Sequence, residues 1–600
     1  MSRGTTSATA FHLGERARYS TKVISPRTEG TGNMIRGARS TLAGFLVLLL
    51  AGCAPVGQST PAAQSSAPSP QSPKRITAAI KFDPPTLVVK LNPATVAGVD
   101  QLEDLVNAGL SVIGEHDVLR PQLAEAVPSS DNGLWRVFPD GTMETTWRIR
   151  PNVRWHDGTP FTSDDLVFTA QVVQDPEIAV LRDVAYTFIA SVEAPDPRTV
   201  TVKWKQPFVE ADALFSRQLA QPMPKHILER VYREEKPAFT DNPYFNTAFV
   251  GTGPYRVHEF VGGSHLLLRA YDEYVFGRPR IDEIEVKFIS DPNVLVANVL
   301  AGSVELSLGR GISLEQAAQV RDQWRDGHVL SALKSWLVVY PQFINSNPQV
   351  ITDVRFRRAL MHAIDRQQLV DTLQFGLVPV AHGILSPGQP QYRDIEQRYV
   401  VRYDYDPRRA IQLVEGLGYT RGSDGIFRDA SDRRLSLEFR TIMTDINQKT
   451  MLAIADDWQR AGIAAETVVI PNQRATDLEY RANFPAVELL RQPDDVRGML
   501  RFHGSEARTA ERGYTGSNNA RYVNPELDSL LDRYRTTIPL PERIDVIGQI
   551  IHHISDQLNA MGMFYDGQPV LVANRVLNVG PGLGEFATQS WNAHEWDVRN

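Results

Sequence analysis

A single cysteine, Cys53, follows the apolar run Thr41–Ala51 near the start of this 600-residue chain. A lone cysteine excludes an internal disulfide and a zinc site built from several thiolates. The apolar run is shorter than the roughly 20 residues of a membrane-spanning helix. No other apolar run in the chain reaches that spanning length. The chain is therefore expected to be globular, and a membrane-spanning transporter is excluded.

The residues before Cys53 have the order of a secretory signal. Arg36 and Arg39 precede the apolar run, and small residues precede the cysteine. The sequence Leu-Ala-Gly-Cys at 50–53 resembles the bacterial lipobox, in which the thiol receives diacylglycerol and the cysteine becomes the new N-terminus. We predict a signal region at 1–52, translation from Met34 and a lipid on Cys53. The alternative is an ordinary signal cut beside an incidental buried cysteine.

Composition after the cysteine predicts a tether and then an acidic body. Residues 54–73 are rich in Pro, Ser, Gln and Ala, so 53–74 is expected to be a flexible linker, with the fold starting near Arg75. Removing the seven basic and two acidic residues of 1–52 leaves 56 basic and 68 acidic residues, a balance of about −12. Nucleic acid is not expected as a partner, because a phosphate backbone favours a basic face.

Strand-like and helix-like patterns alternate along the rest of the chain, which predicts a mixed α/β fold. Thr162, with Asp165 three residues later, predicts a helix start, and Asp353 and Asp365 predict the starts of two successive short helices. The clearest predicted strands are Thr199–Trp204, Ile281–Ile289 and Leu435–Arg440.

Four segments together carry a family resemblance. They are LRPQLAEAVPSSDNG, which continues after the insertion LWRVFPDGTME as TTWRIRPNVRWHDGTPFTSDDLVFT; the stretch Gly251–Leu306; INSNPQVITDVRFRRALMHAIDRQQLV; and YDPRRAIQLVEGLGY. Their sequence and order resemble the extracytoplasmic solute-binding proteins typified by oligopeptide, dipeptide and nickel receptors of ABC importers, known as family 5. The resemblance spans nearly the whole chain after the tether.

The resemblance implies an α/β fold of the periplasmic-binding-protein type, a type II two-lobe clamshell in its large variant with an extra subdomain. Lobe I is expected at 75–336 plus 568–600, with the subdomain at 109–194, and lobe II at 337–567. The hinge is expected near Trp336 and Gly567.

Peptide receptors of the family hold the ligand ammonium with an Asp in a segment written roughly Gly-Trp-x-x-Asp-Tyr-x-x-Pro. The segment Phe484–Ser505 reads FPAVELLRQPDDVRGMLRFHGS here. It contains no Trp, and the glycine that begins the family motif is missing. Asp494 or Asp495 is expected to meet an ammonium, and Arg491 or Arg497 a carboxylate. The alternative for each is a solvated loop residue. Asn345, which matches the family's Asn near the cleft, is expected to hold backbone rather than ligand.

Other motifs favour structural roles. Trp155-His156-Asp157-Gly158 is predicted to be a turn rather than a metal site, and 251–255 a turn into a strand rather than a phosphate loop. His552 and His553 are expected on a helix face. No His-Glu-x-x-His or Gly-x-Ser-x-Gly motif occurs, so no enzyme, metal or cofactor is predicted.

The combined expectation is a lipid-anchored receptor on the periplasmic or cell-surface side of the inner membrane. It would act as a monomer, capture a peptide or similar small polar solute between its lobes, and deliver it to an ABC permease. The alternatives are a ligand-sensing adaptor lipoprotein that serves a receptor, and a periplasmic hydrolase.

Overall fold

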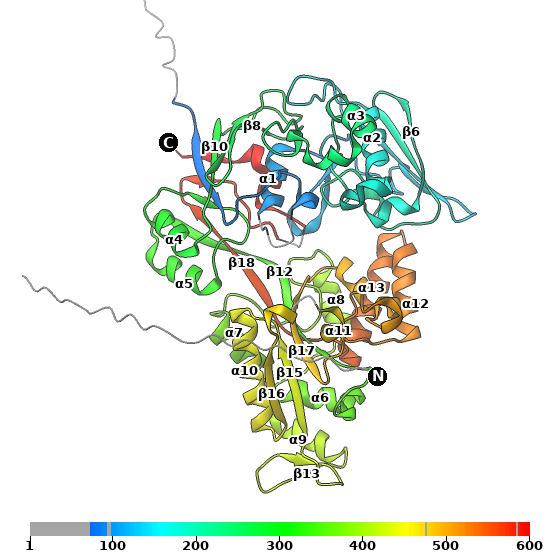
Figure 1. Ribbon diagram of the computed structural model, residues 1–600, viewed down its shortest axis with the longest axis vertical. Helices are drawn as coiled ribbons and strands as arrows, with labels where there is room; N and C mark the ends of the chain where they lie inside the picture. Colours follow the sequence, from blue (N-terminus) through cyan, green and yellow to red (C-terminus); the bar gives the residue numbers. More distant parts are fainter. Residues whose placement is uncertain (1–71, 93–95, 97, 475–476, 584–585, 600) are drawn as a thin grey trace, which may run out of the picture. The chain divides into compact units, whose positions relative to one another are not determined.

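The computed structural model describes residues 72–92, 96, 98–474, 477–583 and 586–599. Residues Gln71–Asn600 form one compact unit (Figure 1). The signal region, Cys53 and the tether up to residue 71 lie outside the described residues, so lipidation and the start at Met34 stay predictions. Among the residues that are described, no helix combines the length and apolarity needed to cross a membrane.

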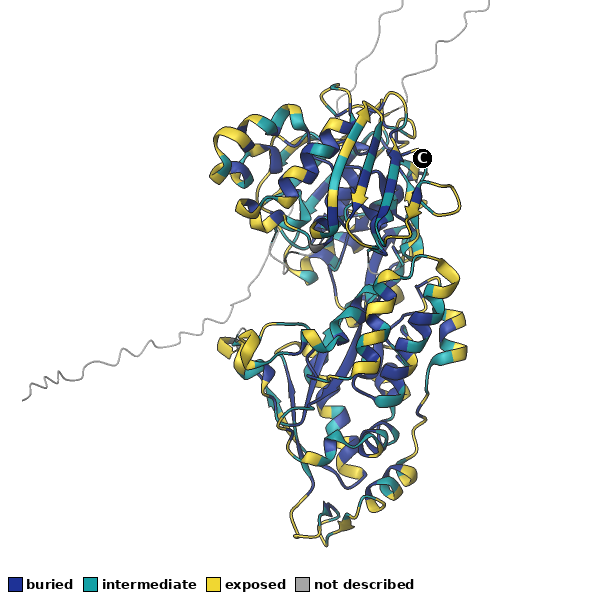
Figure 2. Ribbon diagram, turned by 90° about the vertical axis from the view of Figure 1, so that its right-hand side faces the viewer, coloured by how far each residue is buried: buried dark blue, intermediate teal, exposed yellow. Residues whose placement is uncertain are grey.

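A ten-stranded mixed sheet runs through both halves of this unit, in the order β16-β15-β17-β12-β18-β11-β1-β10-β9-β8. Its central strands β17 and β18 and the second half of β12 are mostly buried, whereas the outer strands β8 and β16 and many helices carry exposed residues (Figure 2). The predicted strands at 281–289 and 435–440 are confirmed as β10 and β15. The bounds are β1 (Arg75–Ile80), β8 (Tyr255–Val261), β9 (His265–Ala270), β10 (Glu283–Phe288), β11 (Leu306–Ser307), β12 (Gly327–Pro341), β15 (Ser436–Thr441), β16 (Ala464–Val469), β17 (Val487–Gln492) and β18 (Met561–Ala573).

The two long strands β12 and β18 connect the halves. They pair antiparallel from Gly327↔Ala573 to Val339↔Met561. One hydrophobic cluster lies toward their first end, built from residues 76–308 and 570–598. Two more lie toward the other end, built from residues 337–564 and 336–565, the first joined by Leu314 and the second by Val209. We call these halves lobe I and lobe II.

Lobe I adds helices and a second sheet, of order β4-β5-β7-β6, to its part of the large sheet. The predicted strand at 199–204 is confirmed as β7, and the insertion at 134–144 forms β4 and the start of β5. The predicted helix start is confirmed, because the Thr162 amide donates to Asp165 Oδ2 at 2.9 Å. The bounds are α1 (Val99–Val106), α2 (Ser163–Gln174), α3 (Lys225–Glu234), α4 (Pro292–Leu300), α5 (Leu314–Gln323), β2 (Ser111–Ile113), β3 (Leu119–Pro121), β4 (Trp135–Val137), β5 (Met143–Arg148), β6 (Ile189–Asp196), β7 (Thr199–Trp204), β19 (Val576–Leu577) and β20 (Asp597–Val598).

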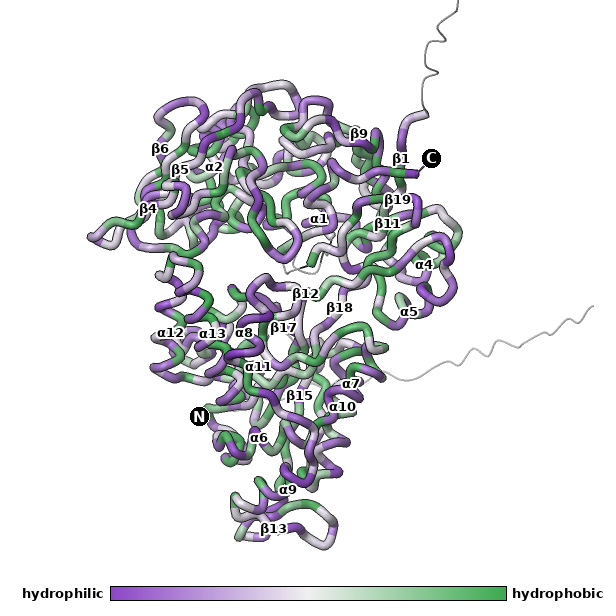
Figure 3. The backbone as a smooth tube through the Cα atoms, turned by 180° about the vertical axis from the view of Figure 1, so that it is seen from behind, coloured by the Kyte–Doolittle hydropathy of each residue, from purple (hydrophilic) through white to green (hydrophobic). Residues whose placement is uncertain are grey.

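Lobe II covers its sheet with helices on both faces. Its two successive helix starts are confirmed, because the carboxylates of Asp353 and Asp365 accept from the amides of Arg355 and Gln368. Hydrophilic and hydrophobic residues alternate along most of the chain in both lobes, as amphipathic elements require (Figure 3). The bounds are α6 (Val354–His362), α7 (Arg366–Leu373), α8 (Tyr392–Tyr399), α9 (Pro407–Glu415), α10 (Asp445–Arg460), α11 (Leu478–Ala482), α12 (Pro525–Thr536), α13 (Leu540–Gln557), β13 (Thr420–Arg421) and β14 (Phe427–Arg428).

The Trp155–Gly158 motif is a turn, as predicted. The Trp155 side chain is fully buried, and its carbonyl accepts from the Gly158 amide at 2.9 Å. His156 is held by backbone rather than by a metal: its Nε2 lies 2.9 Å from the Gly253 carbonyl, and its Nδ1 accepts from the Gly251 amide at 3.3 Å. Burial lowers the pKa of His156 to about 4. The motif therefore joins the segment between β5 and α2 to the turn that leads into β8.

The turn before β8, which contacts the Trp155–Gly158 turn, leaves no room for a side chain at Gly251. A Cβ added there would lie 2.0 Å from the Val106 carbonyl oxygen and 2.9 Å from Phe249 Cε1. Because the nearest atom belongs to backbone, no rotamer change can relieve the clash.

We expect Gly251→Ala to lower the free energy of unfolding by roughly 2–4 kcal/mol, because the added methyl forces α1 and the turn apart. Urea denaturation followed by circular dichroism measures the change. Gly262→Ala is the matched control, since the nearest atom to its added Cβ, Asp83 Oδ2, is 3.9 Å away. Equal stability of the two variants would contradict the close approach at Gly251.

Candidate functional site between the lobes

The carboxyl ends of the parallel strands in both lobes point to the region where the lobes meet. In lobe I, β1, β10 and β11 are parallel, and β11 is antiparallel to β18. In lobe II, β15 and β17 are parallel, and β17 is antiparallel to β12. Since β12 and β18 run in opposite directions, the loops that follow both sets of strands face each other. Such crevices are the usual ligand sites of α/β sheets.

The crossing strands divide this region into two compartments, because neighbouring side chains on a strand point to opposite faces. Tyr565 of β18 packs in the cluster that contains α13, and its hydroxyl donates to the Gly383 carbonyl at 2.8 Å. The next residue, Asp566, instead contacts Arg310 and Arg491. We call the Tyr565 side the front compartment and the Asp566 side the rear compartment.

The front compartment holds a cavity of about 180 Å³ that both lobes line. Its walls carry more acidic than basic groups, with tyrosine and glutamine between them. Burial raises the pKa of Glu210 to about 7 and the pKa of Asp212 to about 6. The charged residues are Asp117, Glu210, Asp212 and Asp495, with Arg497 and Arg543.

The lobes contact each other across the front compartment. Arg497 Nε lies 3.1 Å from Glu210 Oε2, which joins the segment after β17 to the connection between β7 and α3 of lobe I. Gln389 Nε2 donates to Asp117 Oδ2 at 2.7 Å, a second polar contact between lobe II and lobe I. Val209 of lobe I packs into the hydrophobic cluster beside α13. The structure is therefore a conformation with the lobes in contact at this face.

Asp494 is the most unusual group near the front cavity. It directly precedes the cavity residue Asp495, its side chain is 0% exposed, and neither carboxylate oxygen makes a hydrogen bond with a described residue. Burial raises its pKa to about 7, against smaller opposing effects of the nearby Ser386 hydroxyl and the Lys334 ammonium. A buried carboxylate without an ion-pair partner costs several kcal/mol when it is ionised.

Lys334 faces the same compartment from β12. It is the extra residue of a bulge, because Leu333 pairs with Gly567 while Ser335 already pairs with Asp566. A bulge re-aims a side chain, and the Lys334 ammonium contacts the Ala587 carbonyl of lobe I. Burial lowers the pKa of Lys334 to about 8.

The structure brings only some of the sequence-predicted site residues together. Asp494, Asp495 and Arg497 lie at the front compartment, where the Asp495 carboxylate also accepts from the Gly498 amide at 2.8 Å. Arg491 lies in the rear compartment instead. Asn345 lies in an exposed turn after β12, with φ of 56°, and lines neither cavity.

Sequence reasoning missed several charged groups that the structure adds to the two compartments. No motif marked them, because they come from segments far apart in the chain and meet only through the fold. They are Asp117, Glu210, Asp212, Arg310, Lys334 and Asp566.

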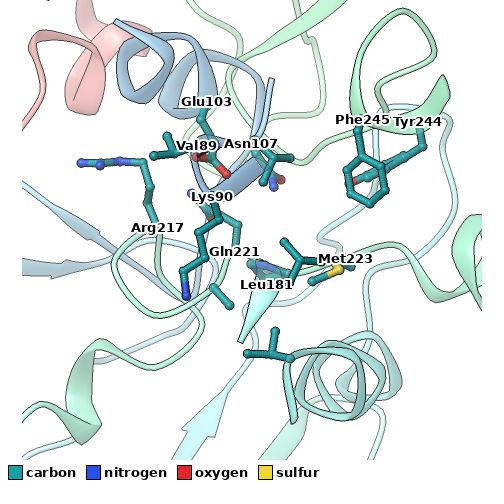
Figure 4. Close-up of a pocket in the computed structure, with 14 residues that line it drawn as sticks. Val89, Lys90, Glu103, Asn107, Leu181, Arg217, Gln221, Met223, Tyr244 and Phe245 are labelled. Carbon is teal, nitrogen blue, oxygen red and sulfur yellow. Dashed lines mark hydrogen bonds between the residues drawn. The ribbon is translucent and has the colours of Figure 1, made fainter. Parts of the chain in front are cut away.

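A separate small cavity lies inside lobe I (Figure 4). Its volume is about 30 Å³, enough for water but not for a solute. Glu103 lines it, with Oε2 accepting from the Val89 amide at 3.1 Å, and burial raises the pKa of Glu103 to about 8. We assign this cavity to the packing of lobe I. Among the described residues, no group of three His, Cys, Asp or Glu side chains is arranged to hold a metal.

Comparison with known families agrees with this geometry. The model of the bacterial extracellular solute-binding proteins, family 5, matches residues 118–499, more than half of the chain. This chain belongs to that family. Its homologues are solute-binding receptors rather than enzymes, and the match confirms the family expected from the sequence.

Solved structures of the family share the fold. An oligopeptide-binding protein of Thermotoga maritima has a TM-score of 0.71 at 18% identity, covering 88% of this chain and 99% of its own. NikZ from Campylobacter jejuni, solved with Ni(L-His), has a TM-score of 0.65 at 20% identity, covering 87% and 99%. The two-lobe α/β clamshell is therefore confirmed.

Curated relatives match at the level of sequence. Putative ABC transporter peptide-binding proteins of Brucella are 26% identical over 292 residues, 48% of this chain, so the chain spans about half (51%) of their length. The oligopeptide-binding protein AppA of Bacillus subtilis is 25% identical over 500 residues, covering 81% of this chain and 85% of its own.

The isolated charge on Asp494 predicts a stability that depends on pH. We expect Asp494→Asn to raise the free energy of unfolding of the ligand-free protein by roughly 1–4 kcal/mol at pH 8. Because burial raises the folded-state pKa to about 7, the ionisation penalty grows as pH rises from about 4 to about 7. The gain should therefore shrink between pH 8 and pH 5.

Urea denaturation at both pH values measures the gain. Asp322→Asn is the control, since that side chain is 72% exposed and pairs only at the surface, so a change below about 0.5 kcal/mol is expected. A loss of stability in Asp494→Asn at pH 8 would show that the carboxylate has a partner in the folded chain.

Proposed function

We propose that this protein is the solute-binding receptor of an ABC importer. It captures a peptide or a similar small polar solute between its lobes and delivers it to the permease. Membership of family 5 supports this role, as do the names of its relatives, which include an oligopeptide-binding protein and peptide-binding proteins of ABC transporters. A lipid on Cys53 holds the receptor, acting as a monomer without a cofactor, on the periplasmic or cell-surface side of the inner membrane.

The observation that carries the proposal is the buried, unpartnered carboxylate of Asp494. An ammonium group of the solute would supply the missing counter-charge and the missing hydrogen-bond donors, so solute binding recovers the cost of burying this carboxylate. The position agrees with the role that the family resemblance gives to an Asp in this segment. Asp494 therefore takes precedence over Asp495, whose carboxylate already accepts from the Gly498 amide.

Arg497 has a different role in this proposal. In the structure the Arg497 guanidinium pairs with Glu210 of the opposite lobe. Arg497 also lines the same cavity as Asp495. A solute carboxylate can compete with Glu210 for this arginine, because burial already disfavours the charged form of Glu210 and raises its pKa. The two ends of a short zwitterionic solute would then be held by one segment of lobe II.

The conformational step follows from the burial of Asp494. A residue that is 0% exposed when the lobes touch is reached by a solute only after the lobes separate. Binding then shifts the equilibrium toward the closed form by the difference in affinity of the two forms for the solute. The paired strands β12 and β18 connect the lobes, so the lobes would rotate relative to each other about these strands.

Short peptides with a free N-terminus are expected to raise the melting temperature of the full chain, purified in detergent. Their affinity should increase as pH rises from 5 toward 7, by up to about tenfold per pH unit, because Asp494 must lose its proton to pair with the ammonium. Calorimetric titration at several pH values measures this slope.

Asp494→Asn should weaken binding and reduce the slope, whereas Glu210 and Asp212, which titrate in the same range, are unchanged in that variant. N-acetylated peptides are the matched ligand control and should bind weakly at every pH. Equal affinity of wild type for free and acetylated peptides would remove Asp494 as the ammonium site.

Membrane attachment is tested separately. Cys53→Ser is expected to abolish metabolic labelling with palmitate and to move the protein from the membrane fraction to the soluble fraction, because acyl chains supply the membrane affinity. Immunoblotting of the two fractions measures the shift, with Ser59→Ala in the tether as the control. Retention of the Cys53→Ser variant in the membrane would contradict the lipid anchor.

A further inference from the structure

The rear compartment holds a larger cavity than the front one. Its volume is about 410 Å³, and its walls come from the start of α5 and the loop before it in lobe I, and from α7, α10 and β17 in lobe II. The strand alternation that separates Asp566 from Tyr565 places this cavity on the opposite face of the crossing strands from Asp494 and Arg497. It is therefore not a continuation of the front cavity.

Two arginines from different lobes converge there on one oxygen atom. Arg310 Nη2 of lobe I donates to Asp566 Oδ2 at 2.9 Å, and Arg491 Nε of lobe II lies 3.0 Å from the same oxygen. The two nitrogens are therefore within about 6 Å of each other, because each is so close to the shared atom. A single carboxylate on β18 thus serves two guanidinium groups.

One shared carboxylate compensates only part of the positive charge of the two arginines. Arg491 Nε is buried, yet it makes no hydrogen bond of good geometry with a described residue. Burial lowers the pKa of Arg491, the nearby Arg310 lowers it further, and Asp566 only partly offsets them. The other charges of the cavity pair among themselves, with Lys449 Nζ 2.9 Å from Asp445 and 3.8 Å from Glu315. The arginine pair therefore carries more positive charge than Asp566 compensates, whereas Lys449 faces two carboxylates.

We propose that the rear compartment is a second binding site, for a small carboxylate-bearing molecule held by Arg310 and Arg491. Guanidinium groups bind carboxylates with two parallel hydrogen bonds, and each arginine keeps N–H groups that Asp566 Oδ2 does not occupy. A cavity of about 410 Å³ lies within the size range of small-molecule sites. The occupant would bridge the lobes beside the hinge and so stabilise the conformation with the lobes in contact.

Asp566 is the resident counter-ion of this site. It is 3% exposed and competes with an incoming carboxylate for the same two arginines. Removing its charge therefore has the opposite effect from removing an arginine: the first strengthens binding of the carboxylate, and the second weakens it. If the three residues had only a structural role, the aspartate and arginine substitutions would not change carboxylate affinity in opposite directions.

Titration of the full chain with sodium succinate tests the proposal, with sodium chloride at equal ionic strength as the reference. We expect a saturable rise in melting temperature for the wild type and at least tenfold weaker binding for Arg310→Gln. Asp566→Asn is expected to bind succinate roughly three- to tenfold more tightly. Arg321→Gln is the matched control, since Arg321 is an exposed arginine of α5 and its loss should leave succinate affinity unchanged.

Far-UV circular dichroism establishes that each variant is folded before titration, and Arg491→Gln replaces any variant that is not. Three outcomes overturn the proposal: no succinate effect beyond that of chloride in the wild type, an unchanged affinity in both arginine variants, or inorganic phosphate binding as tightly as succinate. The last outcome would make this a general anion site rather than a carboxylate site. None of these outcomes bears on peptide binding at Asp494.

Discussion

The antiparallel pairing of β12 with β18 is the constraint on which the other contacts between the lobes depend. The two strands continue the sheets of both lobes, so the lobe I and lobe II strands beside them end at the same place, facing one another. The pleat then divides the space at the crossing, because Tyr565 and Asp566 must point to opposite faces. The bulge at Lys334 breaks this alternation at one position and turns an ammonium toward lobe I.

Charges buried near the crossing differ from charges buried inside a lobe. Glu488 of β17 is 0% exposed, but its carboxylate lies 3.0 Å from Arg481, so this pair serves the packing of lobe II. Asp494, six residues later, is equally buried and has no such partner. A ligand that supplied a counter-charge would recover this cost, and both proposed sites, at Asp494 and at Arg310 with Arg491, rest on such incomplete pairing.

Local patterns predicted much of the fold. The alternating residues at 199–204 became β7, the carboxylates of Asp353 and Asp365 begin two helices, and the turn at Trp155–Gly158 formed as predicted. Such features depend on residues a few positions apart, so a short window of sequence contains the information. Arg491 and Arg497 show the limit, because one lies on the rear face of β17 and the other follows its end at the front.

Sequence alone determined the α/β character and the family motifs and predicted a lipid site and a tether, because each is written in adjacent residues. It also offered Asp494 and Asp495 as candidates in the segment where peptide receptors of the family hold a ligand ammonium. Only the tertiary structure decided which polar groups meet: Glu210 with Arg497, Asp117 with Gln389, and Arg310 with Asp566. Partners so distant in the chain are set by the register of β12 against β18 and by burial between the lobes, which no local pattern encodes.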